Sequence, residues 1–92
     1  MSEERIIVTA LGRNKVGIVA GISSVLAKHN ASIVELTSAK ISSHFVMVML
    51  VDISKVDVSL TDLRKNLNKK GKEIGVQVTA QHEDIFRYMH RI

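Results

Sequence analysis

Apolar residues recur along this 92-residue chain with two different spacings, one typical of strands and one of helices, and segments of the two kinds follow one another. Segments 5–11, 32–41, 44–53 and 76–80 are rich in β-branched residues or alternate apolar with polar positions, which is typical of strands. Segments 16–28 and 60–74 instead place apolar residues at helical spacing, which predicts two amphipathic helices. The expected order is therefore β-α-β-β-α-β.

The boundaries of these elements carry local signals. Ser59 and Asp62 stand three residues apart before the second helix, which is close to a capping box, and Gly75 follows its last apolar position. Asn30, a residue that tolerates left-handed backbone, ends the first helix. At the end of the chain, segment 83–92 spaces its apolar residues as a helix does and begins with acids, so it predicts a short tail helix.

This order is that of the split βαβ motif, and it predicts an α+β, ferredoxin-like sandwich. Right-handed crossovers place both helices on one face of a four-stranded antiparallel sheet, with the short C-terminal helix added at 83–92. At this length we expect one domain, 1–92.

The third predicted strand is apolar on both of its faces. Phe45, Met47, Met49 and Val51 alternate there with Val46, Val48 and Leu50. A sheet covered by helices on one side normally shows a polar second face. We therefore expect the second face to be covered, either by another copy of the chain or by its tail, and we expect a homo-oligomer that uses a sheet face or edge.

Composition removes several kinds of chemistry. The chain has no Cys, which excludes a disulfide framework, a thiolate metal site and a thiol nucleophile. Its aromatic content of 3% leaves little stacking surface for single-stranded nucleic acid. The N-terminus lacks the basic and apolar regions of a signal peptide, and no apolar run reaches the roughly 20 residues of a membrane helix. We expect a cytoplasmic protein with no membrane association and no cofactor.

The glycine-bounded loop 12–17 is the most informative feature, because it leads from a strand into a helix. Backbone N–H groups at a helix N-terminus can bind an anion or a carboxylate, and Gly17 leaves room for a ligand to approach. The alternative is a plain strand-to-helix turn, with Gly17 and Gly21 letting the helix lie close to the sheet.

With this loop in place, the chain resembles the ACT-domain family of small ligand-binding regulatory modules, and in particular the stand-alone single-ACT proteins of prokaryotes. The resemblance covers nearly the whole chain, and segments 8–20, 31–33 and 85–92 carry it. It implies the ferredoxin-like fold and a non-catalytic, allosteric role, in which two domains associate as a homodimer and bind an amino acid at their interface.

The resemblance also implies a set of site residues. Asn14 matches the loop asparagine that holds the ligand, Gly17 the glycine that opens the helix, and Ile18 a following backbone N–H donor. From the other subunit, Ile33 matches the second-strand residue whose backbone meets the ligand. Gly12 and Ser32 belong to the same set, although they stand where a serine-binding member has His and Asn, and Val16 replaces a common Pro. The ligand's identity therefore stays open.

Other functions find less support. A structural or adaptor module that controls a regulator or an enzyme without its own ligand is the main alternative, with an unknown protein partner. An RNA-recognition motif has this strand order, but the third strand offers a single aromatic, Phe45, and the basic run 64–72 is better interpreted as a solvated helix face, so no direct nucleic-acid binding is expected. The loop only partly matches that of acylphosphatase, since no arginine follows it closely, and we expect no enzyme activity.

The remaining polar residues form no convincing site. The four histidines, at positions 29, 44, 82 and 90, lack metal-ligand spacing, so no metal site is expected beyond a chance contact at His82, Glu83 or His90. Glu35 would need a partner such as Lys40 or a ligand amine if its strand buried it.

Overall fold

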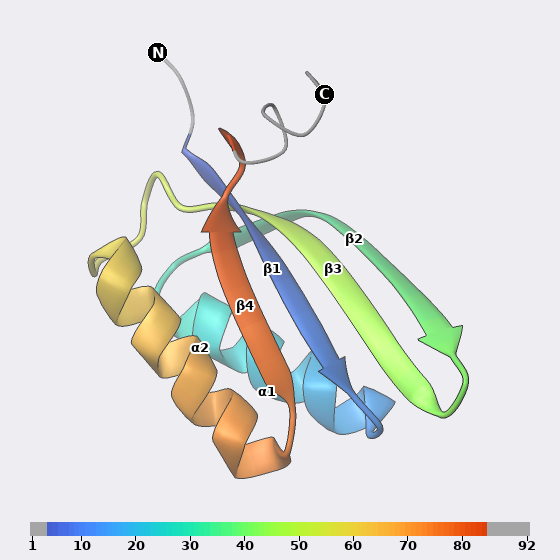
Figure 1. Cartoon of the computed structure of the whole chain (residues 1–92). Coiled ribbons are helices and arrows are strands. Elements are labelled where there is room, and N and C mark those ends of the chain that lie inside the picture. The colour runs from blue at the N-terminus through green and yellow to red at the C-terminus, as the bar shows by residue number, and fades with distance from the viewer. Residues whose placement is uncertain (1–3, 85–92) are drawn as a thin grey trace.

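The computed structural model describes residues 4–84, in which four strands and two helices follow one another in the expected order (Figure 1). The elements are β1 (Arg5–Gly12), α1 (Lys15–Lys28), β2 (Ser32–Ile41), β3 (His44–Asp52), α2 (Leu60–Ile74) and β4 (Gln77–His82). The expected tail helix falls largely on residues 85–92, which lie outside the described residues.

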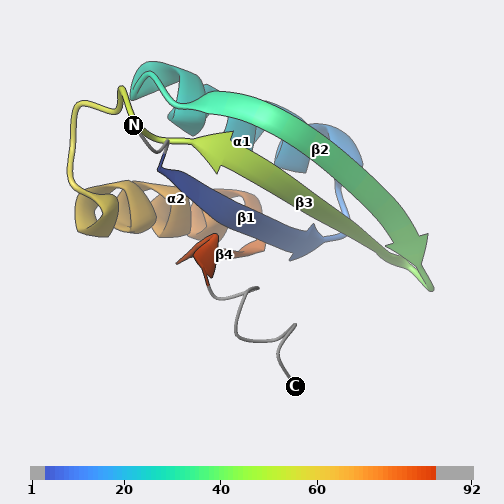
Figure 2. The ribbon, with the colours of Figure 1, turned by 90° about the horizontal axis from the view of Figure 1, so that it is seen from above.

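The strands form one antiparallel sheet in the order β2-β3-β1-β4, so that β2 and β4 are its edges. Figure 2 shows α1 and α2 side by side on one face of the sheet. We call this the helix face and the other the open face. The α+β, ferredoxin-like prediction is thereby confirmed.

Alternation along the central strands decides what the sheet buries. In β1, Ile6, Val8 and Ala10 point to the helix face and are fully buried, whereas Ile7 on the open face is only half-buried. The core is completed by side chains from β3, β4 and both helices, chiefly Ile18, Ile22, Leu26, Met47, Met49, Val51, Leu63 and Leu67. β2 contributes none of the buried core residues. Although its sequence alternates loosely between apolar and polar residues, all ten of its positions are exposed.

The helix boundaries follow the local signals. Ser59 Oγ accepts a hydrogen bond from Asp62 N–H at 3.1 Å at the start of α2, and Gly75 ends that helix with φ of 71°. Asn30 follows α1 with φ of 62°, as expected of a residue that tolerates this region. The fourth strand begins and ends slightly later than the pattern 76–80 predicts, because Val76 N–H still bonds Gly71 C=O and closes the turn after α2.

Candidate functional site

The strand register divides the predicted site residues between two ends of the sheet. Gly12 pairs with Phe45, which pairs with Lys40, and we call this the loop end. Arg5 pairs with Asp52, which pairs with Ser32, at the opposite end. The two rows are 52 − 45 = 7 residues apart along β3, or roughly 23 Å at the usual strand rise.

Four of the six predicted residues lie together at the loop end, namely Gly12, Asn14, Gly17 and Ile18. Ser32 and Ile33 lie at the opposite end, so one copy of the chain does not bring the six together. Only a second copy could place its Ser32 and Ile33 beside the loop.

Asn14 is the N-cap of α1. Its Oδ1 accepts a hydrogen bond from Gly17 N–H at 2.9 Å, and its carbonyl accepts one from Ile18 N–H at 2.9 Å. The Ile18 N–H, which the resemblance implied as a ligand donor, therefore already has an acceptor in this structure, and so does the Gly17 N–H. Helix geometry instead leaves the N–H groups of Lys15 and Val16 without an intrahelical acceptor.

The two loop glycines are explained by local packing. A Cβ at Gly12 would lie 2.9 Å from Val76 Cγ2 and 3.2 Å from Ile18 Cδ1, and both of these side chains belong to the buried core. At Gly17 it would lie 3.1 Å from Asn14 Nδ2, so this glycine makes room for the capping side chain. A glycine at either position serves the turn whether or not a ligand binds.

Two hollows flank the loop, and Arg13 lines both. The first, of about 570 Å³, lies towards α2 and includes Gly12, Asn14 and Lys72. The second, which we call the basic hollow, has a volume of about 350 Å³ and lies between the start of α1 and the end of β2. Arg13, Lys15 and Lys40 line it, and Lys15 Nζ lies 5.6 Å from the centre of the Phe45 ring.

Sequence reasoning missed these three basic residues as a group. Lys40 is 25 positions from Lys15, and only the pairing of β2 with β3 brings it to the loop end. One local signal was present, since a lysine at the first position of a helix opposes the helix dipole.

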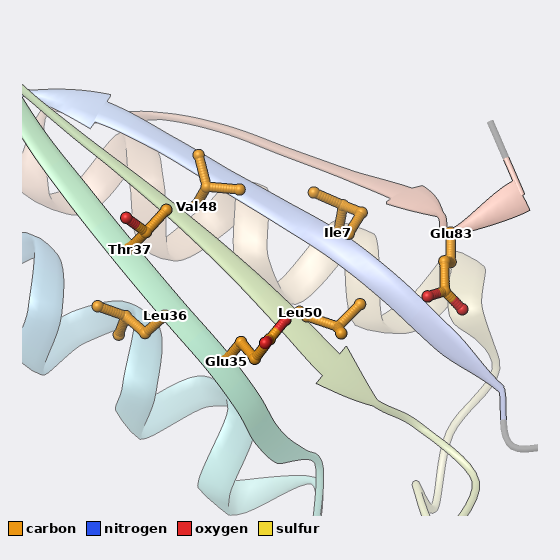
Figure 3. Close-up of a pocket in the computed structure, with 7 residues that line it drawn as sticks. All are labelled: Ile7, Glu35, Leu36, Thr37, Val48, Leu50 and Glu83. Atoms are coloured by element: carbon orange, nitrogen blue, oxygen red, sulfur yellow. The ribbon is translucent and has the colours of Figure 1, made fainter. Parts of the chain in front are cut away.

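A third hollow, of about 640 Å³, lies on the open face (Figure 3). Its floor is apolar, from Ile7, Val48 and Leu50, and the carboxylates of Glu35 and Glu83 border it. These apolar side chains are half-buried, in keeping with the two-sided pattern of β1 and β3.

Glu35 is exposed, so its carboxylate does not need the partner that a buried acid would require. It pairs with Leu50 and is exposed on the open face, whereas Lys40 pairs with buried Phe45 on the helix face. The condition for a Glu35–Lys40 pair, a buried Glu35, is therefore not met, and the two side chains point to opposite faces because odd and even positions of this stretch of strand alternate.

His29 and His82 make side-chain contacts within the protein. His29 Nδ1 lies 3.1 Å from Asp57 Oδ1, and Asn66 Nδ2 lies 2.9 Å from His29 Nε2, so this ring links the end of α1 to the segment before α2 and to α2 itself. Within residues 4–84 no group of three or more His, Asp or Glu side chains could hold a metal ion. His82 Nδ1 lies 3.3 Å from Asp84 Oδ2, and His90 lies outside the described residues.

The basic run on α2 is partly engaged with the protein itself. Arg64 Nε donates to the Ala80 carbonyl at 2.8 Å, which ties α2 to β4, and Lys70 pairs with Glu73 at 3.3 Å. Neither helix of the described chain is long and apolar enough to cross a membrane.

A family model for the ACT domain matches residues 4–81, which include every strand and helix described above except the last residue of β4. The chain belongs to the ACT-domain family. An ACT domain is a regulatory, small-molecule-binding domain, so the expected family and the coarse regulatory role are both confirmed.

Two relatives match this ACT protein over nearly the whole length of both chains. A UPF0237 protein of Methanocaldococcus jannaschii is 52% identical over 96% of this chain and 98% of its own. Another, from Pyrobaculum aerophilum, is 53% identical over 97% of this chain and 99% of its own.

Solved structures agree with the ACT fold. An ACT domain protein from Streptococcus pneumoniae superposes with a TM-score of 0.80 at 28% identity, over 92% of this chain and 96% of that one. A formyltetrahydrofolate deformylase from Pseudomonas syringae has a TM-score of 0.76 at 21% identity, over 89% of this chain and 28% of that one. The second likeness shows the fold alone.

Proposed function

We propose that this ACT protein is a non-catalytic regulator that binds a small molecule, an amino acid by expectation, between the Asn14 loop of one copy and Ser32 and Ile33 of another. Ligand binding then favours the assembly that completes the site. The observation that carries the proposal is the separation of these residues by the length of the sheet within one chain.

The free edge of β2 supports this assembly. All ten residues of β2 are exposed, and its apolar side chains at positions 33, 34, 36 and 41 are between 40% and 61% exposed. An exposed apolar edge strand is a ready template for another strand. In an antiparallel pairing of two β2 edges, the start of one strand lies beside the end of the other. Ser32 of one copy then reaches the loop end of its neighbour.

The loop keeps a donor for such a ligand. Asn14 uses its Oδ1 for the helix cap, and no hydrogen bond within the described residues uses its Nδ2. A ligand carboxylate can accept from this amide and from the N–H groups of Lys15 and Val16.

Thermodynamic linkage converts this geometry into regulation. A ligand that binds only the assembled form stabilises it by RT ln(1 + [L]/Kd), which is about 2.7 kcal/mol at a concentration of 100 times Kd. The readout is thus a shift between free and assembled chains, without any chemical step.

Thermal denaturation with a panel of amino acids tests the proposal when it is paired with light scattering. We expect at least one amino acid to raise both the melting temperature and the assembled fraction. Asn14→Asp retains the capping oxygen but removes the Nδ2 donor, so it should keep the stability of the free protein and lose the ligand shift. A native chain that responds to none of the amino acids contradicts the sensing function.

Two lysine substitutions separate the possible contacts between copies. Val34→Lys places a charge on the β2 edge, and Val48→Lys places one on the open face. We expect Val34→Lys to weaken assembly more, because the proposed site needs the edge. A native chain that stays monomeric at micromolar concentration, with and without amino acids, contradicts self-association.

The open-face hollow favours one alternative, an adaptor that binds another protein without a metabolite. Its apolar floor of Ile7, Val48 and Leu50, bordered by two carboxylates, suits a segment that is apolar and basic. A pull-down with Val48→Lys as the control distinguishes the two functions, since an adaptor should retain one defined protein in the absence of any ligand.

A cytoplasmic location, and the absence of a cofactor and of direct nucleic-acid binding, stay predictions.

A further inference from the structure

The basic hollow gathers positive charge from parts of the chain that are distant in sequence. Arg13 precedes α1, Lys15 opens it, and Lys40 comes from the end of β2. The hydroxyl-bearing residues Ser38 and Ser43 complete the polar lining, and no acidic residue of the described chain takes part in it. Its volume of about 350 Å³ is that of a site for a small ligand.

Within residues 4–84 the charge of the basic hollow is left uncompensated. The acids of residues 4–84 gather at the opposite end of the sheet or in the segments joined to it, namely Glu4, Glu35, Asp52, Asp57, Asp62, Glu83 and Asp84. The remaining acid of these residues, Glu73 near the end of α2, pairs with Lys70 on the same helix. An anion arriving at the loop end therefore meets three cations without a competing carboxylate in the hollow.

Lys15 is placed against the preference of its own helix. The N-terminus of a helix carries a partial positive charge, and the first turn of α1 has no acid to offset it. The ammonium lies over the Phe45 ring, 5.6 Å from its centre, which holds it at the hollow. The N–H groups of Lys15 and Val16 are two further donors at the start of the same helix.

We propose that the basic hollow makes this site selective for a small ligand with two negative charges, such as the two carboxylates of an acidic amino acid or the doubly charged phosphate of a phosphate monoester, over a neutral amino acid. We call such a ligand a dianion, whether or not it also carries an ammonium group. Arg13, Lys15 and Lys40 are the specificity-determining residues. The guanidinium of Arg13 suits a carboxylate or a phosphate because it can donate two parallel hydrogen bonds. This inference rests on the proposed function, since it names the ligand class of the site at the Asn14 loop. Asn14 itself lines the neighbouring hollow, and the basic hollow beside it is complete in one copy.

Titration calorimetry at matched ionic strength tests it with three probes, glutamate, glycerol 3-phosphate and leucine. We expect a dianionic probe to bind at least about tenfold more tightly than leucine. Tighter binding of glutamate identifies the acidic amino acid as the ligand, and tighter binding of glycerol 3-phosphate identifies the phosphate ester. Amide nitrogen–proton NMR spectra should show the largest shifts at Lys15 and Val16.

Neutral glutamine variants assign the binding to the hollow. Arg13→Gln and Lys40→Gln should each weaken the dianion about tenfold or more. Lys65→Gln removes the same charge from α2 at an exposed position that does not line the hollow, and it should change binding less than about twofold. All three positions are exposed, so melting temperatures should confirm that each variant folds.

The outcomes separate this inference from the proposed function. If leucine or another neutral amino acid binds and drives assembly while the dianions do not, the selectivity is wrong and the regulatory function stands. If a dianion binds without changing assembly, the hollow is a site and the coupling is wrong. An equal loss in Lys65→Gln and Lys40→Gln would overturn the site, because it would show an effect of net charge alone.

Discussion

The two helices cover the same face of the sheet, but their first turns are built differently. α2 begins with a serine cap and Asp62 in its first turn, and it ends with Lys72 and a left-handed Gly75. Each of these choices favours the helix dipole or satisfies a terminal backbone group. α1 has an equivalent cap in Asn14, but it opens with Lys15 and has no first-turn acid.

This difference indicates which helix terminus serves stability alone. The first turn of α2 follows the rules of an isolated helix, whereas that of α1 breaks one of them beside a hollow lined with further cations. A local preference that is broken next to a cavity is a reason to look for a ligand.

The largest effect is expected where α2 meets β4. A Cβ at Gly71 would lie 2.7 Å from the Val76 carbonyl oxygen and 2.9 Å from Val78 Cγ2. Gly71→Val should therefore lower the free energy of unfolding by about 3 kcal/mol, because backbone cannot move aside easily. Urea denaturation measures the loss.

The matched control is Gly21→Ala on α1. There the added Cβ would lie 3.0 Å from Ile74 Cδ1, the end of a side chain that can rotate. A change within about 1 kcal/mol is expected, since alanine also favours the helix. Equal losses in the two variants would mean that the close backbone approach at Gly71 is not decisive.

Removing either helix cap should have a smaller effect. Ser59→Ala and Asn14→Ala each delete an oxygen that accepts a first-turn N–H, at 3.1 Å and 2.9 Å respectively. Each should cost about 1 kcal/mol of unfolding free energy in urea. Only Asn14→Ala should also reduce the thermal shift caused by a ligand. A comparable reduction in Ser59→Ala would place ligand binding away from the α1 loop.

Exchanging the charges of the two first turns should move stability in opposite directions. Lys15→Glu places an acid at the start of α1 and should stabilise the protein by about 0.3–1 kcal/mol, while abolishing dianion binding. Asp62→Lys should destabilise it by a similar amount. Thermal denaturation at low and high salt checks both, since salt should shrink each difference. A destabilised Lys15→Glu would show that Lys15 stabilises the free fold.

The smallest effect concerns Asp52, the last residue of β3. Ser54 N–H donates to Asp52 Oδ1 at 2.8 Å and lowers the pKa of this carboxyl below its ordinary value, with help from the Ser54 side chain and from Arg5 and Lys55. A lowered pKa in the folded state contributes stability above the unfolded pKa of about 3.9, and this contribution is lost as the pH falls through the folded pKa.

Urea midpoints measured from pH 6 down to pH 2 should therefore decline less steeply in Asp52→Asn than in the native chain. The slopes of the two pH profiles should differ only below about pH 4. Identical profiles would show that the contact with Ser54 does not persist in solution.

Much of the fold could be predicted from the sequence because its signals are local. The period of apolar residues distinguishes strands from helices, and single residues such as Ser59, Asn30 and Gly75 mark where helices begin or end. The same alternation correctly places apolar residues on both the helix face and the open face of β1 and β3. It could not show that β2 stays exposed throughout, because that depends on where α1 and α2 lie across the sheet.

Only part of the candidate site could be predicted from such local signals. The pattern of the sequence alone established the order of the elements, the loop 12–17 that leads from a strand into a helix, and the resemblance that the family match confirmed. Only the tertiary structure decided that Lys40 joins Arg13 and Lys15, and that Ser32 and Ile33 lie at the far end of the sheet. The physical reason is that register and crossover geometry arise from packing between distant segments, and no short stretch of sequence encodes them alone.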